Sequence, residues 1–198
     1  MTVAPAQAAG YRYWSFWDRD SASKETWTYA TAGPSQAKPS DGDVQGFRFA
    51  VSADSKDATQ PRGAADFDGI CEDTPAKDGK KRVALVIDFG TAADAPSGET
   101  PPKPRTACAQ VAEDATSADA LAAVAKPLRY DSSAMLCAIS GYPKSGCGEQ
   151  VSGKTDKAAS QPADSGSDDG PSVGLIAGIA VVVVLGVAAG VQARRRRN

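Results

Sequence analysis

The feature that most constrains this chain is a 21-residue apolar segment near its C-terminus, which begins at Val173 and ends at Ala193. It contains no charged residue, and as an α-helix it would be about 31 Å long, close to the thickness of the hydrocarbon core of a bilayer. A buried helix of a soluble domain is the alternative, but the polar linker before the segment and the arginines after it favour a membrane span. We therefore expect one transmembrane helix at residues 173–193.

Basic residues beside a membrane span remain in the cytoplasm and so predict its orientation. The tail at residues 194–198 contains Arg194, Arg195, Arg196 and Arg197. It predicts a single-pass protein of the cell membrane with a cytoplasmic C-terminus and with residues 1–172 outside. Within the span, Gly174 with Gly178 and Gly186 with Gly190 have the spacing that allows a second helix to approach closely, so an oligomer through these glycines is an alternative to a lone span.

Export of the N-terminal part requires a signal peptide, and residues 1–8 resemble the end of one. Residues 6–8 read Ala-Gln-Ala, which matches the small-residue cleavage pattern of signal peptides. The charged and apolar parts of a signal peptide are not found before this pattern. We expect that such a part precedes the present start and that the mature protein begins near Ala9.

Charge and composition exclude several classes of function. Without the arginine tail, residues 1–193 hold 18 basic and 24 acidic side chains, and such an acidic surface argues against a nucleic-acid partner. The sequence has no histidine, which excludes Ser-His-Asp and Cys-His catalytic arrangements and metal sites with histidine ligands. We therefore predict no enzymatic activity, no cofactor and no metal site. The acidic pairs Asp41 with Asp43 and Asp66 with Asp68 fit turns or a helix cap.

The four cysteines all precede the polar linker at residues 151–172, which we predict to be a disordered tether. Cys71, Cys108, Cys137 and Cys147 are even in number, and two disulfides are expected outside the cell. Three pairings are open, because spacing alone does not decide between them. We favour Cys137 with Cys147, which closes a tight turn, and Cys71 with Cys108, which joins segments on either side of a predicted strand.

The region at residues 9–150 is predicted to be a small, mostly antiparallel α+β domain. Strand patterns occur at residues 11–17, 26–31, 46–52, 83–89, 106–111 and 136–140, and the first two predict a hairpin. The apolar stretch at residues 83–89 predicts an interior strand. A short helix is expected from Thr116 to about Ala125, because Thr116 is followed by an apolar pattern that ends before Pro127.

Nine of the thirteen aromatic residues lie between Tyr11 and Phe49, including all three tryptophans. Rings occupy both faces of the predicted first strand, so one face is expected in the core. The other is covered by the chain itself or forms a surface for a partner protein or a flat ligand. The candidate ligand-binding residues are Trp14, Trp17, Trp27, Tyr29 and Tyr142.

Several segments resemble uncharacterised, exported proteins of Streptomyces and related actinobacteria that are anchored by a C-terminal membrane helix. The segments are LCAISGYP at residues 136–143 with Gly146 and Cys147, YWSFW at residues 13–17, WTY at residues 27–29 and DGDVQGFRF at residues 41–49. The resemblance implies genes that are often placed near components of energy-coupling-factor transporters.

The same segments are remotely similar to the β-grasp module of transcobalamin-like C-terminal domains. In that module the helix (SADAL at residues 117–121 here) and the turn at residues 139–143 precede the Trp-Thr-Tyr strand, so the order in this chain is permuted. The module caps one face of a cobalamin. The resemblance thus implies a non-catalytic binding module, accessory to a transporter that takes up a cofactor or a metal, with a corrinoid-like ligand. The alternative is a structural subunit that docks a membrane or exported protein through its aromatic face.

Overall fold

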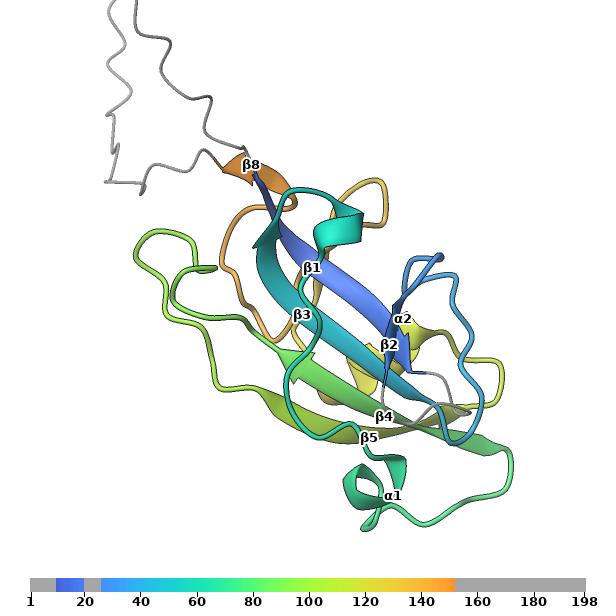
Figure 1. Cartoon of the computed structure of the whole chain (residues 1–198). Helices are drawn as coiled ribbons and strands as arrows, with labels where there is room; N and C mark the ends of the chain where they lie inside the picture. Colours follow the sequence, from blue (N-terminus) through green and yellow to red (C-terminus); the bar gives the residue numbers. More distant parts are fainter. Residues whose placement is uncertain (1–9, 20–25, 152–198) are drawn as a thin grey trace, which may run out of the picture. The chain divides into compact units, whose positions relative to one another are not determined.

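The computed structural model describes residues 10–19 and 26–151 of the chain (Figure 1). The strands are β1 (Gly10–Arg19), β2 (Trp27–Tyr29), β3 (Val44–Ser52), β4 (Lys80–Asp88), β5 (Arg105–Ala112), β6 (Arg129–Tyr130), β7 (Leu136–Ala138) and β8 (Glu149–Val151). The helices are the short 3-10 helix η1 (Ser55–Asp57), α1 (Phe67–Ile70) and α2 (Ser117–Val124).

Several predictions lie outside these described residues, namely the signal-peptide remnant at residues 1–8, the linker from residue 152 onward, the membrane span with its glycine pairs, and the arginine tail. Within residues 10–19 and 26–151, no helix is long and apolar enough to cross a bilayer. Val151 is the last residue of β8, so the folded domain includes the first residue of the segment predicted as a linker.

Six strands form one mixed sheet in the order β2-β1-β3-β4-β5, and β8 pairs with the start of β1 beside β2. The pairing of β3 with β4 is parallel, whereas the other pairs in this sheet are antiparallel. The predicted α+β class, the mostly antiparallel sheet and the first hairpin are therefore confirmed. The strand predicted at residues 83–89 is interior, between β3 and β5, and begins three residues earlier, at Lys80.

One face of the sheet is covered by α2 and by the hairpin of β6 and β7. Alternate residues of the strands point to this face, and Phe47, Leu85 and Ile87 are fully buried there against Leu121 of α2. Thr116 and Asp119 form the capping box of α2, in which the Thr116 side chain accepts a hydrogen bond from the Asp119 N–H. The helix predicted from Thr116 is thus confirmed.

The other face is partly covered by the long connection between β3 and β4. Parallel neighbours in a sheet cannot be joined by a tight turn, and here residues 53–79 make the crossover. Its α1 segment packs Ala65 and Ile70 against Val44, Ala84 and Val86 of the sheet. The crossover therefore provides a second, smaller core.

Both favoured disulfides are present. Cys71 with Cys108 joins the crossover to β5, and Cys137 with Cys147 joins β7 to the segment before β8. Closing a loop of 37 residues removes chain entropy from the unfolded state that corresponds to about 4 kcal/mol of stability. The first disulfide therefore holds the crossover against the sheet.

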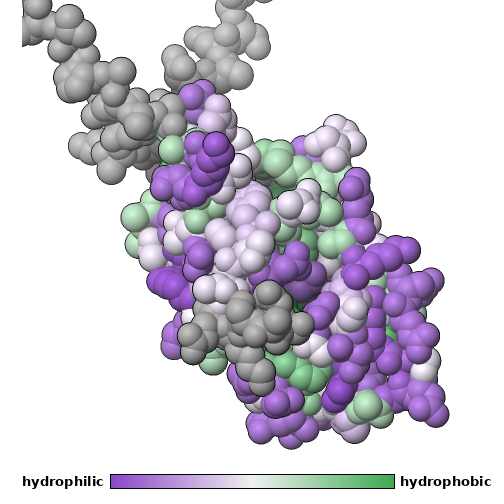
Figure 2. Space-filling model, turned by 45° about the vertical axis from the view of Figure 1, so that its right-hand side comes forward, coloured by the Kyte–Doolittle hydropathy of each residue, from purple (hydrophilic) through white to green (hydrophobic). Residues whose placement is uncertain are grey.

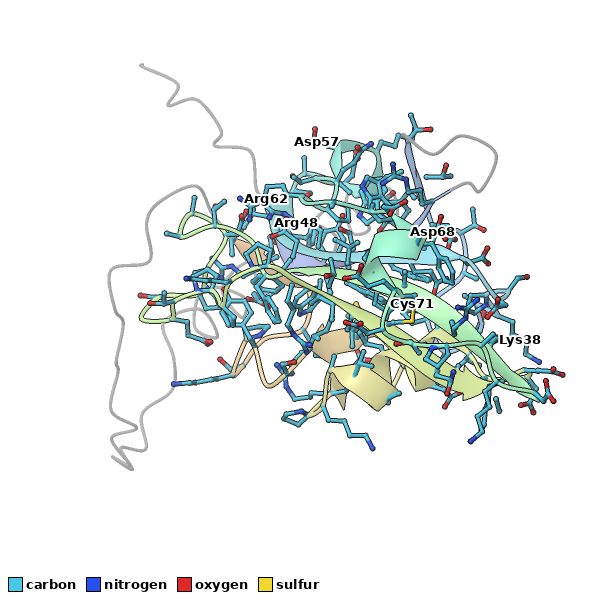
Figure 3. All side chains as sticks on the ribbon, turned by 90° about the horizontal axis from the view of Figure 1, so that it is seen from below. Lys38, Arg48, Asp57, Arg62, Asp68 and Cys71 are labelled. Carbon is cyan, nitrogen blue, oxygen red and sulfur yellow. A yellow bond between two sulfur atoms is a disulfide. The ribbon has the colours of Figure 1, made fainter. Side chains whose placement is uncertain are left out.

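A buried ion pair links the two parallel strands. Arg48 of β3 and Asp88 of β4 lie opposite one another, and Nη1 of Arg48 is 2.7 Å from Oδ1 of Asp88. Arg62 of the crossover donates to both oxygens of Asp88, at 2.7 and 2.8 Å, and Asp94 pairs with Nη2 of Arg48 at 3.1 Å. Arg48 and Arg62 are labelled close to one another in Figure 3. Burial alone raises the pKa of Asp88, but the hydrogen bonds from Arg62 and Gly90 and the charge of Arg48 outweigh it and lower the pKa to about 2.

We predict that Asp88 makes the stability of the domain depend on acid pH. Its pKa is lower in the folded state than the usual 3.8, so its contribution is fully present above about pH 4 and is lost as the pH falls towards 2. Asp88→Asn leaves the buried Arg48 with Asp94 as its one remaining anionic partner and should lower the free energy of unfolding at pH 7 by about 2 to 4 kcal/mol. Urea denaturation between pH 7 and pH 2 measures both effects.

Asp41→Asn is the matched control, because Asp41 pairs with Arg82 but its side chain is 48% exposed. It should cost less than about 1 kcal/mol at pH 7. The difference between wild type and Asp88→Asn should shrink below pH 4. A difference that stays constant down to pH 2 would show that Asp88 is not the titrating group.

Candidate functional site

The five candidate ligand-binding residues do not form one surface. Successive side chains of a strand point to opposite faces, so Trp14 and Trp17 of β1 lie on opposite sides of the sheet. Trp14 belongs with Tyr142 to the core under α2, whereas Trp17 lies with Trp27 and Tyr29 on the other face.

Trp14 and Tyr142 are buried, with 6% and 5% of their surfaces exposed. Nε1 of Trp14 donates to the carbonyl oxygen of Tyr142 at 3.3 Å, and both rings make edge contacts with Phe89. Burial, with the nearby charges of Glu99 and Asp94, raises the pKa of Tyr142 to about 12. These two side chains stabilise the core and present no ring to solvent.

On the sheet face opposite α2, the side chain of Trp17 is buried beside Tyr29. It is 5% exposed, its Nε1 donates to Oγ of Ser15 at 2.8 Å, and the ring of Tyr29 packs edge-on against it with centroids 5.1 Å apart. Trp27 and Tyr29 are half-buried on β2. Trp17 therefore supports the rings above it.

Two further tyrosines of β1, which the sequence prediction omitted, belong to the same face. Tyr11 is 45% exposed and Tyr13 is half-buried. Burial, and then the neighbouring Tyr29, raise the pKa of Tyr13 to about 12. We define the aromatic surface as Tyr11, Tyr13, Trp27 and Tyr29. The alternation of side chains along β1 follows from the sequence, and it places Tyr11 and Tyr13 on the same side of the strand as Trp17.

Gly46 of β3 makes room for one edge of the aromatic surface. A Cβ atom at this position would lie 2.8 Å from Cη2 of Trp27 and 2.7 Å from Cγ of Pro61. The indole therefore lies directly over the backbone of β3. The guanidinium of Arg19 lies 5.8 Å from the centre of the Trp27 ring, at the distance of a cation–π contact.

Figure 2 shows hydrophilic residues gathered along one side of the visible face of the domain, with hydrophobic residues in small separate patches. The rings of the aromatic surface are tyrosine and tryptophan, which have an apolar body and a polar tip. Such amphipathic rings are typical of surfaces that bind a partner.

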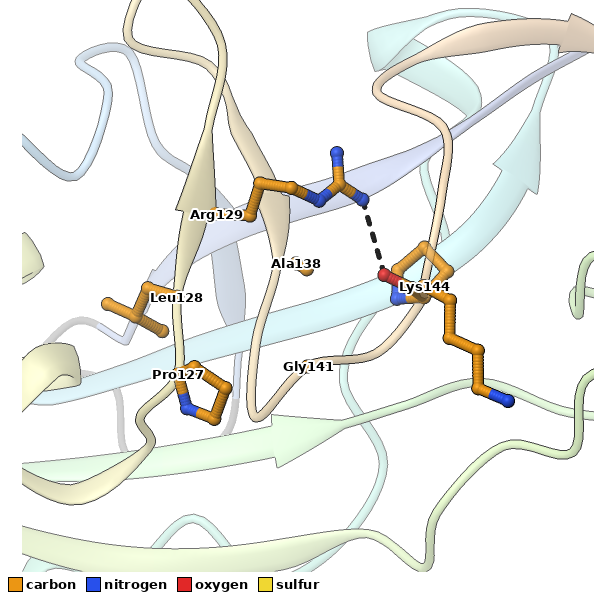
Figure 4. A pocket seen from close by; sticks show the side chains of 7 residues that line it. Pro127, Leu128, Arg129, Ala138, Gly141 and Lys144 are labelled. Carbon is orange, nitrogen blue, oxygen red and sulfur yellow. Dashed lines mark hydrogen bonds between the residues drawn. The ribbon is translucent and has the colours of Figure 1, made fainter.

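A separate pocket of about 250 Å³ lies on the α2 side of the sheet, beside the turn that follows β7 (Figure 4). It is lined by Pro127, Leu128, Arg129, Ala138, Gly141, Pro143 and Lys144. Arg129 donates to the carbonyl oxygen of Pro143 at 3.2 Å, which joins the two walls. The lining is apolar with two cations and no acidic side chain, so it is unsuited to acid–base chemistry by a pair of carboxylates.

Three of the four carboxylates in the acidic pairs accept hydrogen bonds from backbone N–H groups, and those of Asp66 and Asp43 lie in a helix cap and a turn, as predicted. Asp66 caps α1 by accepting from the N–H of Gly69 at 2.7 Å, and Asp43 accepts from the N–H of Ser40 at 2.7 Å. Asp41 accepts from the N–H of Arg82 at 2.6 Å, and its hydrogen bonds with Arg82 lower its pKa. Each of these three carboxylates therefore has a structural partner.

Asp131 lies close to the sulfur atoms of Cys137 and Cys147, a grouping with the composition of a metal site. The two cysteines are joined in a disulfide, however, and metal ions bind the thiolate form. This grouping offers only one carboxylate as a ligand.

Fold, disulfides and rings together define a small disulfide-bonded α+β domain with an aromatic surface at one edge of its sheet. The model of the SCO2322-like domain, a family named for a Streptomyces protein, matches residues 6–152. The chain belongs to this family, in agreement with the predicted resemblance to Streptomyces proteins. No curated protein and no solved structure matches the chain significantly.

We predict that Gly46→Ala disturbs the aromatic surface. The added methyl group requires Trp27 or Pro61 to move, which should lower the free energy of unfolding by about 1 to 3 kcal/mol and change the near-ultraviolet circular dichroism of the tryptophans. Gly33→Ala is the control, because no atom lies within 4 Å of a Cβ added there. Equal stabilities and equal spectra for the two variants would contradict the close packing of Trp27 on β3.

Proposed function

We propose that this chain is a non-catalytic binding module, held outside the cell membrane by a helix at residues 173–193, whose contact site is the aromatic surface. The observation that carries the proposal is the group of four rings on the sheet face opposite α2, of which Tyr11 is exposed and the other three are half-buried. Rings of this kind add large contact area at low cost in conformational entropy.

Two observations support a location of the folded domain on the outer side of the cell membrane. The disulfides Cys71 with Cys108 and Cys137 with Cys147 are typical of oxidising compartments. The arginines after residue 193 favour a cytoplasmic C-terminus, with the domain on the opposite side.

We further propose that the fold is a permuted β-grasp. In a β-grasp module a hairpin precedes the helix, two strands follow it, and the first and last strands lie side by side and parallel. Here β4 and β5 form the hairpin before α2, and β3 lies parallel to β4 with β1 beyond it. Linking the end of the α2 region to β1 would restore the usual order, which supports the remote similarity to transcobalamin-like modules.

The structure favours a ligand that lies on the aromatic surface over a ligand enclosed in a pocket. The pocket near Arg129 has about 250 Å³, less than the volume of typical ligand pockets, and it lies on the opposite face of the sheet from the rings. A corrinoid is too large for it, whereas the open aromatic surface could cover one face of such a ligand. In this proposal the module serves a transporter that takes up a cofactor or a metal.

The ligand version is tested by isothermal titration of the purified full chain in detergent with cyanocobalamin. Binding is expected in wild type, and Tyr29→Ala should weaken it at least tenfold, because Tyr29 is half-buried and rests on Trp17. The control is Met135→Ala, which removes an apolar side chain that is 41% exposed and lies outside the aromatic surface. No binding at millimolar ligand, or equal weakening by both variants, would overturn the corrinoid version.

The alternative occupant of the same rings is a membrane or exported protein. A photoreactive amino acid in place of Tyr11, which is exposed, should then crosslink a defined partner in native membranes, whereas the same group in place of Met135 should not. If cyanocobalamin does not bind and neither position gives a specific crosslink, the aromatic surface is not a binding site.

A further inference from the structure

The pocket beside the turn that follows β7 has room for one small ring. Its volume is about 250 Å³, and an apolar protein cavity of about 150 Å³ holds one benzene molecule. The remaining space admits a small substituent on such a ring. The pocket therefore fits a ligand of about ten non-hydrogen atoms, smaller than the ligands of most binding pockets.

The walls of this pocket are held together by hydrogen bonds within the chain. The N–H of Gly141 donates to the carbonyl oxygen of Pro127 at 3.0 Å, and Arg129 donates to that of Pro143 at 3.2 Å. Both prolines and Leu128 give the lining its apolar surface. Because the walls are already connected, a ligand does not have to order them, which lowers the cost of binding in conformational entropy.

The two cations of the lining have no acidic partner among the residues that the structure describes. The bond to Pro143 uses one of the five N–H donors of Arg129, and the side chain of Lys144 is exposed. In residues 10–19 and 26–151, neither side chain forms an ion pair with aspartate or glutamate. The carboxylate of Glu99 lies nearby, but it accepts from the backbone N–H of Lys144, at 3.1 and 3.2 Å.

Other arginines of the domain differ from Arg129 in this respect. Four of them pair with carboxylates of their own chain, namely Arg12, Arg48, Arg62 and Arg82. A guanidinium beside apolar surface is suited to a carboxylate, which it can bind through two parallel hydrogen bonds. The partner that the chain does not supply to Arg129 is thus an anion.

We propose that this pocket binds a small aromatic monocarboxylate, with its ring on the apolar lining and its carboxylate between Arg129 and Lys144. The lining has no acidic side chain that would receive an ammonium group, so a free amino acid is a poorer fit. An inorganic anion would leave the apolar lining in contact with water. The site lies on the sheet face opposite the aromatic surface, so its test does not depend on the function proposed above.

Leu128 reports directly on the pocket, because it lines it and is one of only six leucines in the chain. The experiment records leucine-methyl NMR spectra of the full chain in detergent, with the Leu128 signals assigned from their loss in Leu128→Val. Benzoate should shift these signals with a dissociation constant on the order of 1 mM. Benzamide, which has the same shape without the charge, should bind at least fivefold more weakly.

Two variants test the cations separately. Arg129→Gln should weaken benzoate binding at least fivefold, and Lys144→Gln, which changes an exposed side chain, about twofold to threefold. The control is Lys77→Gln, since Lys77 is exposed on the crossover, and it should leave binding unchanged. Thermal unfolding establishes that the variants fold, and Lys144→Gln keeps the test decisive if Arg129→Gln does not.

Four results would each overturn the proposal. The first is an unshifted Leu128 signal at about 20 mM benzoate, and the second is equal affinity for benzoate and benzamide. The third is inorganic phosphate shifting the Leu128 signals as strongly as benzoate, which would show a site for any anion. The fourth is wild-type affinity in the folded variants of Arg129 and Lys144.

Discussion

The structure depends on the parallel pairing of β3 with β4 in a sheet that is otherwise antiparallel. Because parallel neighbours need a long connection, residues 53–79 must cross one face of the sheet. Arg62 on this connection reaches the carboxylate of Asp88, to which Arg48 is also paired, so one buried charge group holds both strands and the crossover. Since the crossover reaches only part of this face, the rings on β1 and β2 remain accessible. The aromatic surface is thus a consequence of the strand order.

Local patterns predicted much of this architecture. The alternation at Phe47, Phe49 and Val51, the apolar stretch at residues 83–89 and the cap at Thr116 each specify an element through neighbouring residues alone. The pairing of β8 was not predictable in this way, because three residues with no apolar alternation join a strand 137 residues away. For the aromatic residues too, local patterns predict the face of the strand but not the contacts with distant segments. The burial of Trp14 under Tyr142 depends on a contact between distant segments, whereas the shared face of Tyr11, Tyr13 and Trp17 follows from alternation alone.

The pairing of β8 with the start of β1 determines how the domain responds to mechanical load. Tension applied at Val151 acts first on the three residue pairs of β8 and can peel them one after another from β1. Peeling stops at Cys147, two residues before β8, because its disulfide to Cys137 passes the force to β7. β8 is thus a short extensible section, and the covalent bond behind it protects the sheet from being unravelled by the chain that leaves it.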